Sequence, residues 1–173
     1  MAEDYRTHFS RFFSPGLQAV WVHRIGVKAM MLRRPARFFL SAIYLFGHWF
    51  CKAIYGIEMQ RSVKIGRRFL IGHQGAIVVH QYATFGDDCI IRQGVTLGVG
   101  TTWEEGKGPV IGDRVSFSPG CVIVGNVRIG DDVQIGPNCV VTTDVPSDRV
   151  LFVAPPRVFP RATDAAGSSE ERP

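Results

Sequence analysis

The chain of 173 residues has few of the features that cross-link a protein or bind a metal. Its four cysteines form no CxxC pair and lack the spacing typical of zinc ligands. Because 46% of the residues are apolar, the chain can build a core without disulfides, and a reducing, cytoplasmic setting is expected. No run of five or six like charges is present, so the net charge of +5 does not indicate a nucleic-acid partner.

The N-terminus, MAEDYR, lacks the short apolar core and the small-residue cleavage site of a secretory signal. One apolar run of 20 residues, at 38–57, is long enough to cross a bilayer. His48 and Lys52 interrupt it, which favours a buried or interfacial helix over a spanning one. We expect the basic residues of this region to form an exposed helix face, with peripheral contact to an acidic lipid surface as the alternative; they are Arg24, Lys28, Arg33, Arg34 and Arg37.

Apolar residues recur at helical spacing from Pro15 to about Tyr55, and Pro35 interrupts them, which predicts two helices. From Ile65 onward a six-residue repeat replaces this spacing. One apolar series consists of Ile65, Ile71, Val79, Phe85, Ile91, Leu97, Ile111, Phe117, Ile123, Ile129, Ile135 and Val141. A second series, four residues later, consists of Ala83, Cys89, Val95, Val115, Cys121, Val127, Val133, Cys139 and Val145.

Two matched series of this kind predict the hexapeptide units of a parallel β-helix. Three units make a triangular coil of about 18 residues, and successive coils stack their apolar positions into an internal column. Cys121 and Cys139 are 18 residues apart, so we expect them to stack as small core residues in successive coils rather than to form a disulfide. The glycines that follow the first series suggest turns with positive φ or close backbone approach.

Two insertions interrupt the repeat. The step from Ile71 to Val79 is eight residues instead of six, and the step from Leu97 to Ile111 is fourteen. Extra residues must leave the coil as loops, and loops held on a rigid scaffold commonly carry function. The sequence therefore predicts a functional site at these loops.

Several stretches identify a family resemblance: PGLQAVWVHRIG (15–26), IEMQRSVKIGRRFLIGHQGAIVV (57–79), IIRQGVTLG (90–98), VGNVRIGDDVQIGPNCVVTTDVP (124–146) and APPRV (154–158). Through them the chain resembles the serine-acetyltransferase branch of the left-handed β-helix acyltransferases, and within it the short colanic-acid-type acetyltransferases of exopolysaccharide pathways. The resemblance implies a left-handed β-helix, a homotrimer, acetyl-CoA as donor and an active site between neighbouring prisms. We expect an α-helical region at 1–57, the acyltransferase β-helix at 58–147, and a C-terminal extension at 148–173 that is disordered after about residue 162.

The resemblance places the catalytic histidine at His73, inside the first insertion, with Glu58 as its carboxylate partner. A neutral imidazole can take the proton of an alcohol as that alcohol attacks a thioester, and a carboxylate on the other ring nitrogen fixes the tautomer. From the residues themselves, Glu58 has an alternative role in a surface salt bridge with Arg61 or Arg67. His80 is expected in a turn or at the rim of the substrate site.

The chain departs from the family pattern around the acceptor. Gly72 stands where serine acetyltransferases have the Asp that holds the ammonium of serine, and only the positive charge of Lys107 survives beside the second insertion, since Gly108 replaces a family His. Desolvating an ammonium without a counter-charge costs free energy. The missing carboxylate therefore suggests that the acceptor is an uncharged sugar hydroxyl rather than a free amino acid. On the donor side, the resemblance implies a main-chain surface that binds acetyl-CoA, which we call the donor shelf. It is formed by Gly98, Ser118, Pro119, Gly136 and Pro137, and Arg157 is expected to contact a CoA phosphate.

The leading hypothesis is an acetyl-CoA-dependent O-acetyltransferase that acts on a sugar of an exopolysaccharide or its lipid-linked precursor, in the cytoplasm or at the inner face of the membrane. One alternative is serine O-acetylation for cysteine biosynthesis, and another is a non-catalytic β-helix scaffold. A zinc hydratase resembling the γ-type carbonic anhydrases would need three histidine ligands, and the predicted β-helix contains only His73 and His80. No metal is therefore expected.

Overall fold

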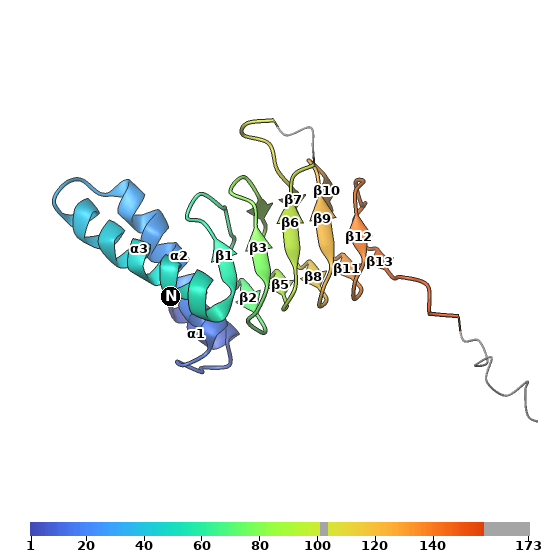
Figure 1. Cartoon of the computed structure of the whole chain (residues 1–173), viewed down its shortest axis with the longest axis horizontal. Helices are drawn as coiled ribbons and strands as arrows, with labels where there is room; N and C mark the ends of the chain where they lie inside the picture. The colour runs from blue at the N-terminus through green and yellow to red at the C-terminus, as the bar shows by residue number, and fades with distance from the viewer. Residues whose placement is uncertain (101–103, 158–173) are drawn as a thin grey trace, which may run out of the picture.

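The structure is a computed structural model, which describes residues 1–100 and 104–157. Three helices come first: α1 (Ala2–Thr7), α2 (Pro15–Met31) and α3 (Ala36–Tyr55). α2 and α3 lie side by side as a hairpin against the first coil of a β-helix (Figure 1). The two helices predicted on either side of Pro35 are confirmed, whereas α1 was not predicted because six residues carry too little periodicity.

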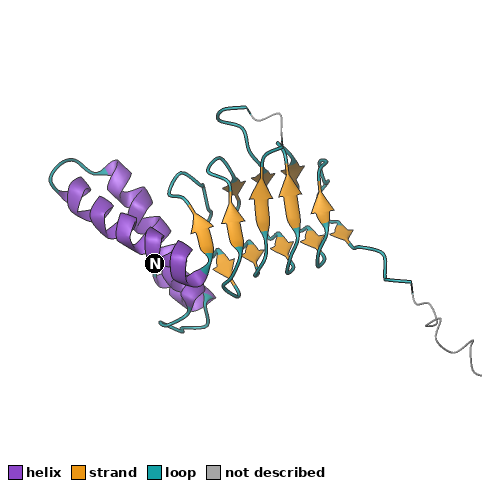
Figure 2. Ribbon diagram, in the orientation of Figure 1, coloured by secondary structure: helices purple, strands orange, loops and turns teal. Residues whose placement is uncertain are grey.

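The rest of the described chain forms three parallel sheets that wrap one column (Figure 2). The first sheet contains β1 (Ile57–Met59), β3 (Ile77–Val79), β6 (Thr96–Gly98), β9 (Val122–Val124) and β12 (Val140–Val141). The second contains β4 (Thr84–Phe85), β7 (Val110–Ile111) and β10 (Arg128–Ile129). The third contains β2 (Leu70–Ile71), β5 (Ile90–Ile91), β8 (Ser116–Phe117), β11 (Gln134–Ile135) and β13 (Val150–Leu151).

Strand register confirms the hexapeptide coil. Ile123 pairs with Val141, 18 residues later, which is one regular coil. Ile57 pairs with Ile77, a step of 20, because the coil between them carries the two-residue insertion. Leu97 pairs with Ile123, a step of 26, because that coil carries the eight-residue insertion.

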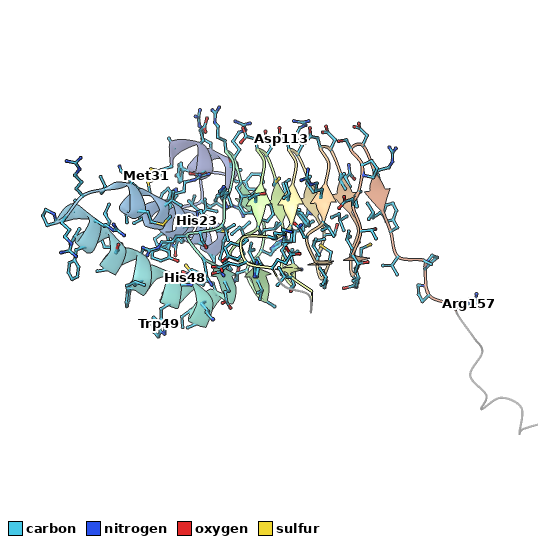
Figure 3. The ribbon with its side chains drawn as sticks, turned by 90° about the horizontal axis from the view of Figure 1, so that it is seen from above. His23, Met31, His48, Trp49, Asp113 and Arg157 are labelled. Atoms are coloured by element: carbon cyan, nitrogen blue, oxygen red, sulfur yellow. The ribbon has the colours of Figure 1, made fainter. Side chains whose placement is uncertain are left out.

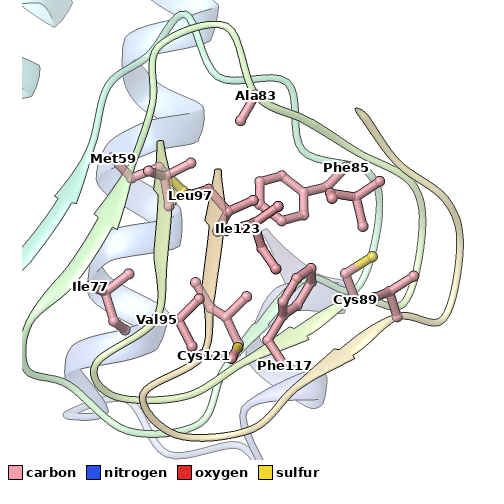
Figure 4. Packing of buried hydrophobic residues seen from close by; sticks show 14 of the residues in the cluster. Met59, Ile77, Ala83, Phe85, Cys89, Val95, Leu97, Phe117, Cys121 and Ile123 are labelled. Atoms are coloured by element: carbon pink, nitrogen blue, oxygen red, sulfur yellow. The ribbon is translucent and has the colours of Figure 1, made fainter. Parts of the chain in front are cut away.

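The core is the stacked column that the two apolar series predict (Figure 4). Phe69, Phe85 and Phe117 stack edge to face along it, with ring centroids 5.0 and 6.1 Å apart. Cys89, Cys121 and Cys139 are buried free thiols, as expected. Each large aliphatic or aromatic side chain in the column contributes about 1.5–3 kcal/mol of burial free energy, so the column fixes the coils on which any site is built.

Glycine is required at one turn of each coil because backbones meet there. A Cβ on Gly86 would lie 2.7 Å from the backbone of Gly112, and a Cβ on Gly112 would lie 2.8 Å from the backbone of Gly130. Side-chain oxygens accept hydrogen bonds between successive turns at this corner. The backbone amide of Asp87 donates to Asp113 Oδ1 over 2.7 Å, and the backbone amide of Asp113 donates to Asp131 Oδ1 over 2.8 Å. This corner is therefore structural and leaves the other two corners free for function.

The C-terminal part of the described chain adds strand β13 beside β11 and then runs away from the coil. The expected disorder after about residue 162 lies outside the described residues.

Candidate active site

His73 lies in the turn 72–76, which joins the third sheet to the first sheet. Gly75 has φ +109° and Ala76 has φ +50°, so the two inserted residues turn the chain outward before β3 begins. The imidazole is exposed and makes no hydrogen bond with the described residues. It faces a cavity of about 560 Å³ lined by the segments 11–16 and 72–74.

The other wall of this cavity is the connection between α1 and α2, and buried polar contacts hold it in place. The His8 Nδ1 atom donates to the Asp4 carbonyl over 2.8 Å, and its Nε2 atom accepts from the Ile71 amide over 3.3 Å. Burial lowers the pKa of His8, so the ring stays neutral and both bonds persist near neutral pH. Arg24 holds the Asp4 carboxylate with contacts of 2.8 and 2.9 Å. The cavity wall is thus anchored next to the His73 turn.

Arg11 is the charged group of the cavity that the sequence interpretation missed. Its side chain is exposed, lines the cavity with His73, and forms no ion pair with the described residues. Among the described residues, no acidic side chain lines this cavity. A cation therefore lies in the same cavity as His73.

Glu58 lies on β1, and the structure does not pair it with His73. Its carboxylate forms an ion pair with Lys52 Nζ at 3.0 Å, across the junction between α3 and β1. The alternative partners are also engaged elsewhere, because Arg67 pairs with Glu3 and Arg61 lies over the Tyr44 ring, 5.1 Å from its centroid. The role of Glu58 beside His73 stays a prediction.

Four of the predicted acetyl-CoA residues meet at the same corner as His73. Ser118 and Pro119 follow β8, and Gly136 and Pro137 follow β11, each in the turn from the third sheet to the first. They line one cavity of about 250 Å³. Arg92, which the sequence interpretation missed, lines it too and donates to Ser116 Oγ over 3.2 Å and to the Phe117 carbonyl over 3.4 Å.

The remaining predicted residues lie elsewhere. Gly98 is the last residue of β6, and His80 and Lys107 lie in the segments that join the first sheet to the second, at a different corner of the coil. His80 Nδ1 accepts from the Tyr82 amide over 3.4 Å, and Lys107 pairs with Glu104. Arg157 is exposed on the C-terminal segment, away from both corners (Figure 3). Within one chain, His73 and the donor shelf therefore lie at a different corner of the coil from Lys107.

The two glycines that replace family side chains differ in the space around them. A Cβ on Gly72 would lie 3.7 Å from its nearest neighbours, Arg92 Cγ and the Ile91 carbonyl, which is ordinary contact. A Cβ on Gly108 would lie 2.9 Å from the backbone of Tyr82. Gly108 is thus fixed by packing, whereas Gly72 has room for a side chain.

The described residues contain no group of three or more His, Cys, Asp or Glu side chains placed to hold a metal ion. This corner of the coil carries an exposed imidazole, a cation in the same cavity, and a second cavity lined by Ser118 and Arg92.

Known proteins share the repeat and much of the sequence of this chain. Residues 108–143 match the bacterial transferase hexapeptide repeat (six repeats). The chain is 39% identical over 145 residues to a serine acetyltransferase of Bacillus licheniformis, covering 83% of this chain and 63% of that protein. It is 40% identical over 124 residues to a serine acetyltransferase of Staphylococcus epidermidis, covering 66% of this chain and 51% of that one. The chain is therefore similar in sequence to hexapeptide-repeat acyltransferases.

Solved structures of serine acetyltransferases share the fold. Serine acetyltransferase isoform 3 of Entamoeba histolytica, in complex with cysteine, superposes with a TM-score of 0.75 at 22% identity, over 94% of this chain and 60% of that one. The Brucella abortus serine acetyltransferase in complex with coenzyme A gives a TM-score of 0.75 at 21% identity, over 90% and 64%. The left-handed β-helix that the sequence resemblance implied is confirmed. The chain spans one half to two thirds of the length of these relatives.

These relatives correct two expectations. The predicted closeness to colanic-acid-type enzymes is not supported, and a sugar of an exopolysaccharide as acceptor is contradicted, because the relatives are serine acetyltransferases. The sugar hypothesis rested on the missing carboxylate at Gly72. It overlooked Arg11, which comes from a segment remote in sequence and offers a counter-charge to the carboxylate of an amino acid.

Proposed function

We propose that this chain transfers the acetyl group of acetyl-CoA to the hydroxyl of serine. The observation that carries the proposal is 39% identity over 145 residues to a protein named serine acetyltransferase, a stretch that is 83% of this chain. Two features of the structure support the same chemistry. His73 is exposed in a cavity that also contains Arg11, and the donor shelf lies at the same corner of the coil.

His73 is the proposed general base. As the serine oxygen attacks the thioester carbonyl carbon, the imidazole takes the hydroxyl proton, and backbone N–H groups stabilise the oxyanion. The carbon–sulfur bond then breaks, and the CoA thiolate takes the proton from the imidazolium. The products are O-acetylserine and CoA, and His73 returns to its starting state. Glu58 is the proposed orienter of the ring, which requires its carboxylate to exchange Lys52 for His73.

Arg11 is the proposed partner of the serine carboxylate. A guanidinium holds a carboxylate through two parallel hydrogen bonds, which would fix the direction of the hydroxyl toward His73. Ser14 and Gln74 line the same cavity and offer neutral oxygens to the ammonium. Gly72 supplies no acid there, so the ammonium is the less well bound end of the substrate.

The donor shelf is the cavity at Ser118, Pro119, Gly136 and Pro137. Its carbonyls and the Ser118 hydroxyl suit the amide groups of pantetheine, and the Arg92 guanidinium suits an anionic portion of CoA. Arg157 stays a proposed contact for a CoA phosphate.

A homotrimer is proposed because one chain divides the predicted residues between two corners. The corner with His73 and the donor shelf would face the corner with Gly98, His80 and Lys107 of a neighbouring copy. A cyclic assembly makes this contact at every interface. Each complete site would then take residues from two chains.

The test is serine-dependent release of CoA thiol from acetyl-CoA by the purified protein. L-Alanine, which lacks the hydroxyl, is the matched control substrate. We expect thiol release above background hydrolysis with L-serine alone and a product with the mass of O-acetylserine. Saturable CoA binding without any serine-dependent release would contradict the proposed acceptor, and absence of both would contradict the proposed enzyme.

A further inference from the structure

The helix α3 turns its most apolar side to solvent. Phe38, Phe46 and Trp49 are 78%, 69% and 59% exposed, and Phe39 and Leu45 are 67% and 61% exposed. We call these five residues the α3 apolar face. The side that packs on the protein carries Tyr44 and Cys51, the buried residues of the helix. A surface helix of a soluble protein normally has the reverse arrangement, with its polar side outward.

The extent of this face sets it apart from a scatter of exposed apolar residues. Within the described part of the chain, α3 is the one helix long and apolar enough to span a membrane, with a mean hydropathy of 1.2. Only 11% of its apolar window is buried, whereas the core helix of a soluble protein would be mostly buried. Contiguous exposed apolar surface of this kind marks an interaction site. Trp49 lies on the outer side of the helical hairpin (Figure 3).

The positive charge of the chain is concentrated in the helical region that contains this face. Residues 5–57 contain no Asp or Glu at all. Residues 1–57 carry eight Lys and Arg against two acids, whereas residues 58–173 carry twelve against thirteen. The helical region therefore has a net charge of +6 and the remainder −1, which together give the +5 of the whole chain.

Three of these cations lie at the start of α3. Arg33, Arg34 and Arg37 are exposed and form no ion pair within the described residues. Arg34 and Arg37 line a hollow of about 290 Å³ together with Phe38 and Ser41. Guanidinium groups at the edge of an exposed aromatic surface match a bilayer interface, where phosphates lie above acyl chains.

We propose that the α3 apolar face binds the surface of an anionic phospholipid bilayer, with Arg33, Arg34 and Arg37 on headgroup phosphates. The occupant is lipid rather than a second copy of this chain. Two copies that met through this face would bring their cations together, and residues 5–57 contain no acid to neutralise them.

The helix lies along the bilayer surface and does not cross it, because its other side is held by the protein. α3 packs along α2, and α2 is bound to the first coil through the His23 Nε2 contact with the Val63 carbonyl (2.9 Å) and the Arg24 contact with the Gly66 carbonyl (2.9 Å). Lys52 is paired with Glu58 of β1. Spanning would require these polar contacts to break. Since the cytoplasmic leaflet is anionic, the proposal places the protein at that leaflet.

The test is co-sedimentation of the full chain with vesicles of phosphatidylcholine alone and of equal parts phosphatidylcholine and phosphatidylglycerol. We expect binding to the anionic vesicles only, with affinity that falls as salt is added. Replacing Arg33, Arg34 and Arg37 together with Gln should weaken binding on the order of 100-fold, since each surface cation contributes about fivefold. Arg128→Gln, an exposed arginine of β10, is the matched control and should bind as the wild type does.

A second variant tests the apolar contact. Phe46→Gln with Trp49→Gln should abolish vesicle binding without loss of fold, because both side chains are exposed, and Val140→Gln, 66% exposed on β12, should have no effect. Equal binding to neutral vesicles, or no binding to either kind, would overturn the proposal. Loss of a larger oligomer in the Phe46/Trp49 variant without any vesicle binding would show that a second copy covers the face. Quenching of Trp49 by deep lipid labels rather than shallow ones would exclude the interfacial position.

Discussion

Replacing Gly72 with aspartate puts a carboxylate beside His73, at the point where the proposed site lacks one. Serine carries an ammonium near neutral pH, and no acidic residue in the described part of the chain lines the cavity that would receive it. The backbone permits the change, since the φ of Gly72 lies outside the left-handed region and a Cβ there would meet its nearest atoms at 3.7 Å. The Gly72→Asp variant should therefore fold and bind serine more tightly.

The size of the effect follows from the exposure of the turn. A hydrogen bond to a charged group contributes about 1.5–3 kcal/mol. Gly72 is exposed, so solvent screening reduces the gain in binding free energy to the low end of that range or below it. A gain of about 1.4 kcal/mol corresponds to about a tenfold lower KM for serine. Because the carboxylate binds substrate and transition state alike, kcat should change little.

The assay is initial-rate thiol release at varied L-serine with saturating acetyl-CoA. Gly72→Asn is the matched control, because it adds the same volume without the charge. We expect Gly72→Asp to lower KM and Gly72→Asn to leave it unchanged. If both variants leave KM unchanged while circular dichroism shows intact folds, the ammonium is not bound at this turn and the placement of serine beside His73 is wrong.

Three further changes probe the site and its support. Arg11→Gln should raise the KM for serine about tenfold while the exposed neighbour variant Arg6→Gln leaves it unchanged, and equal kinetics for the two would remove Arg11 from the site. Arg92→Ala should weaken CoA binding several-fold in calorimetry, and unchanged binding would remove Arg92 from the donor shelf. Burial lowers the pKa of His23 from 6.5 to about 4. Between pH 6.5 and about 4 the unfolded chain therefore binds more protons than the folded chain. The free energy of unfolding should fall by about 3 kcal/mol as the pH drops across this range. Urea unfolding should show a shallower pH slope for His23→Gln, and an unchanged slope would refute the assignment.

The coil could be predicted because its signal is periodic and local. Each six-residue unit places one large and one small apolar residue inward, and every member of both series is buried or half-buried. The end members Ile65 and Val145 are half-buried because one neighbouring coil is missing at each end. The insertions were equally visible, since a broken period in a repeat must become a loop.

The site was less predictable because its contacts are remote in sequence. Arg11 reaches the His73 cavity through a connection that His8 fixes, and no local pattern encodes that contact. Lys52 meets Glu58 because Gly56, with φ +63°, caps the C-terminal end of α3 and turns the chain back into β1. Arg92 could have been found, because it lies 20 residues after Gly72 and therefore one coil above it.

The central claim is that the imidazole of His73 takes the proton of serine. The most direct measurement is the rate of serine-dependent thiol release by His73→Ala, compared with His48→Gln, a half-buried histidine of α3. We predict a fall of about 10²–10⁴-fold for His73→Ala with CoA binding retained, and a wild-type rate for His48→Gln. A wild-type rate for His73→Ala would contradict the account.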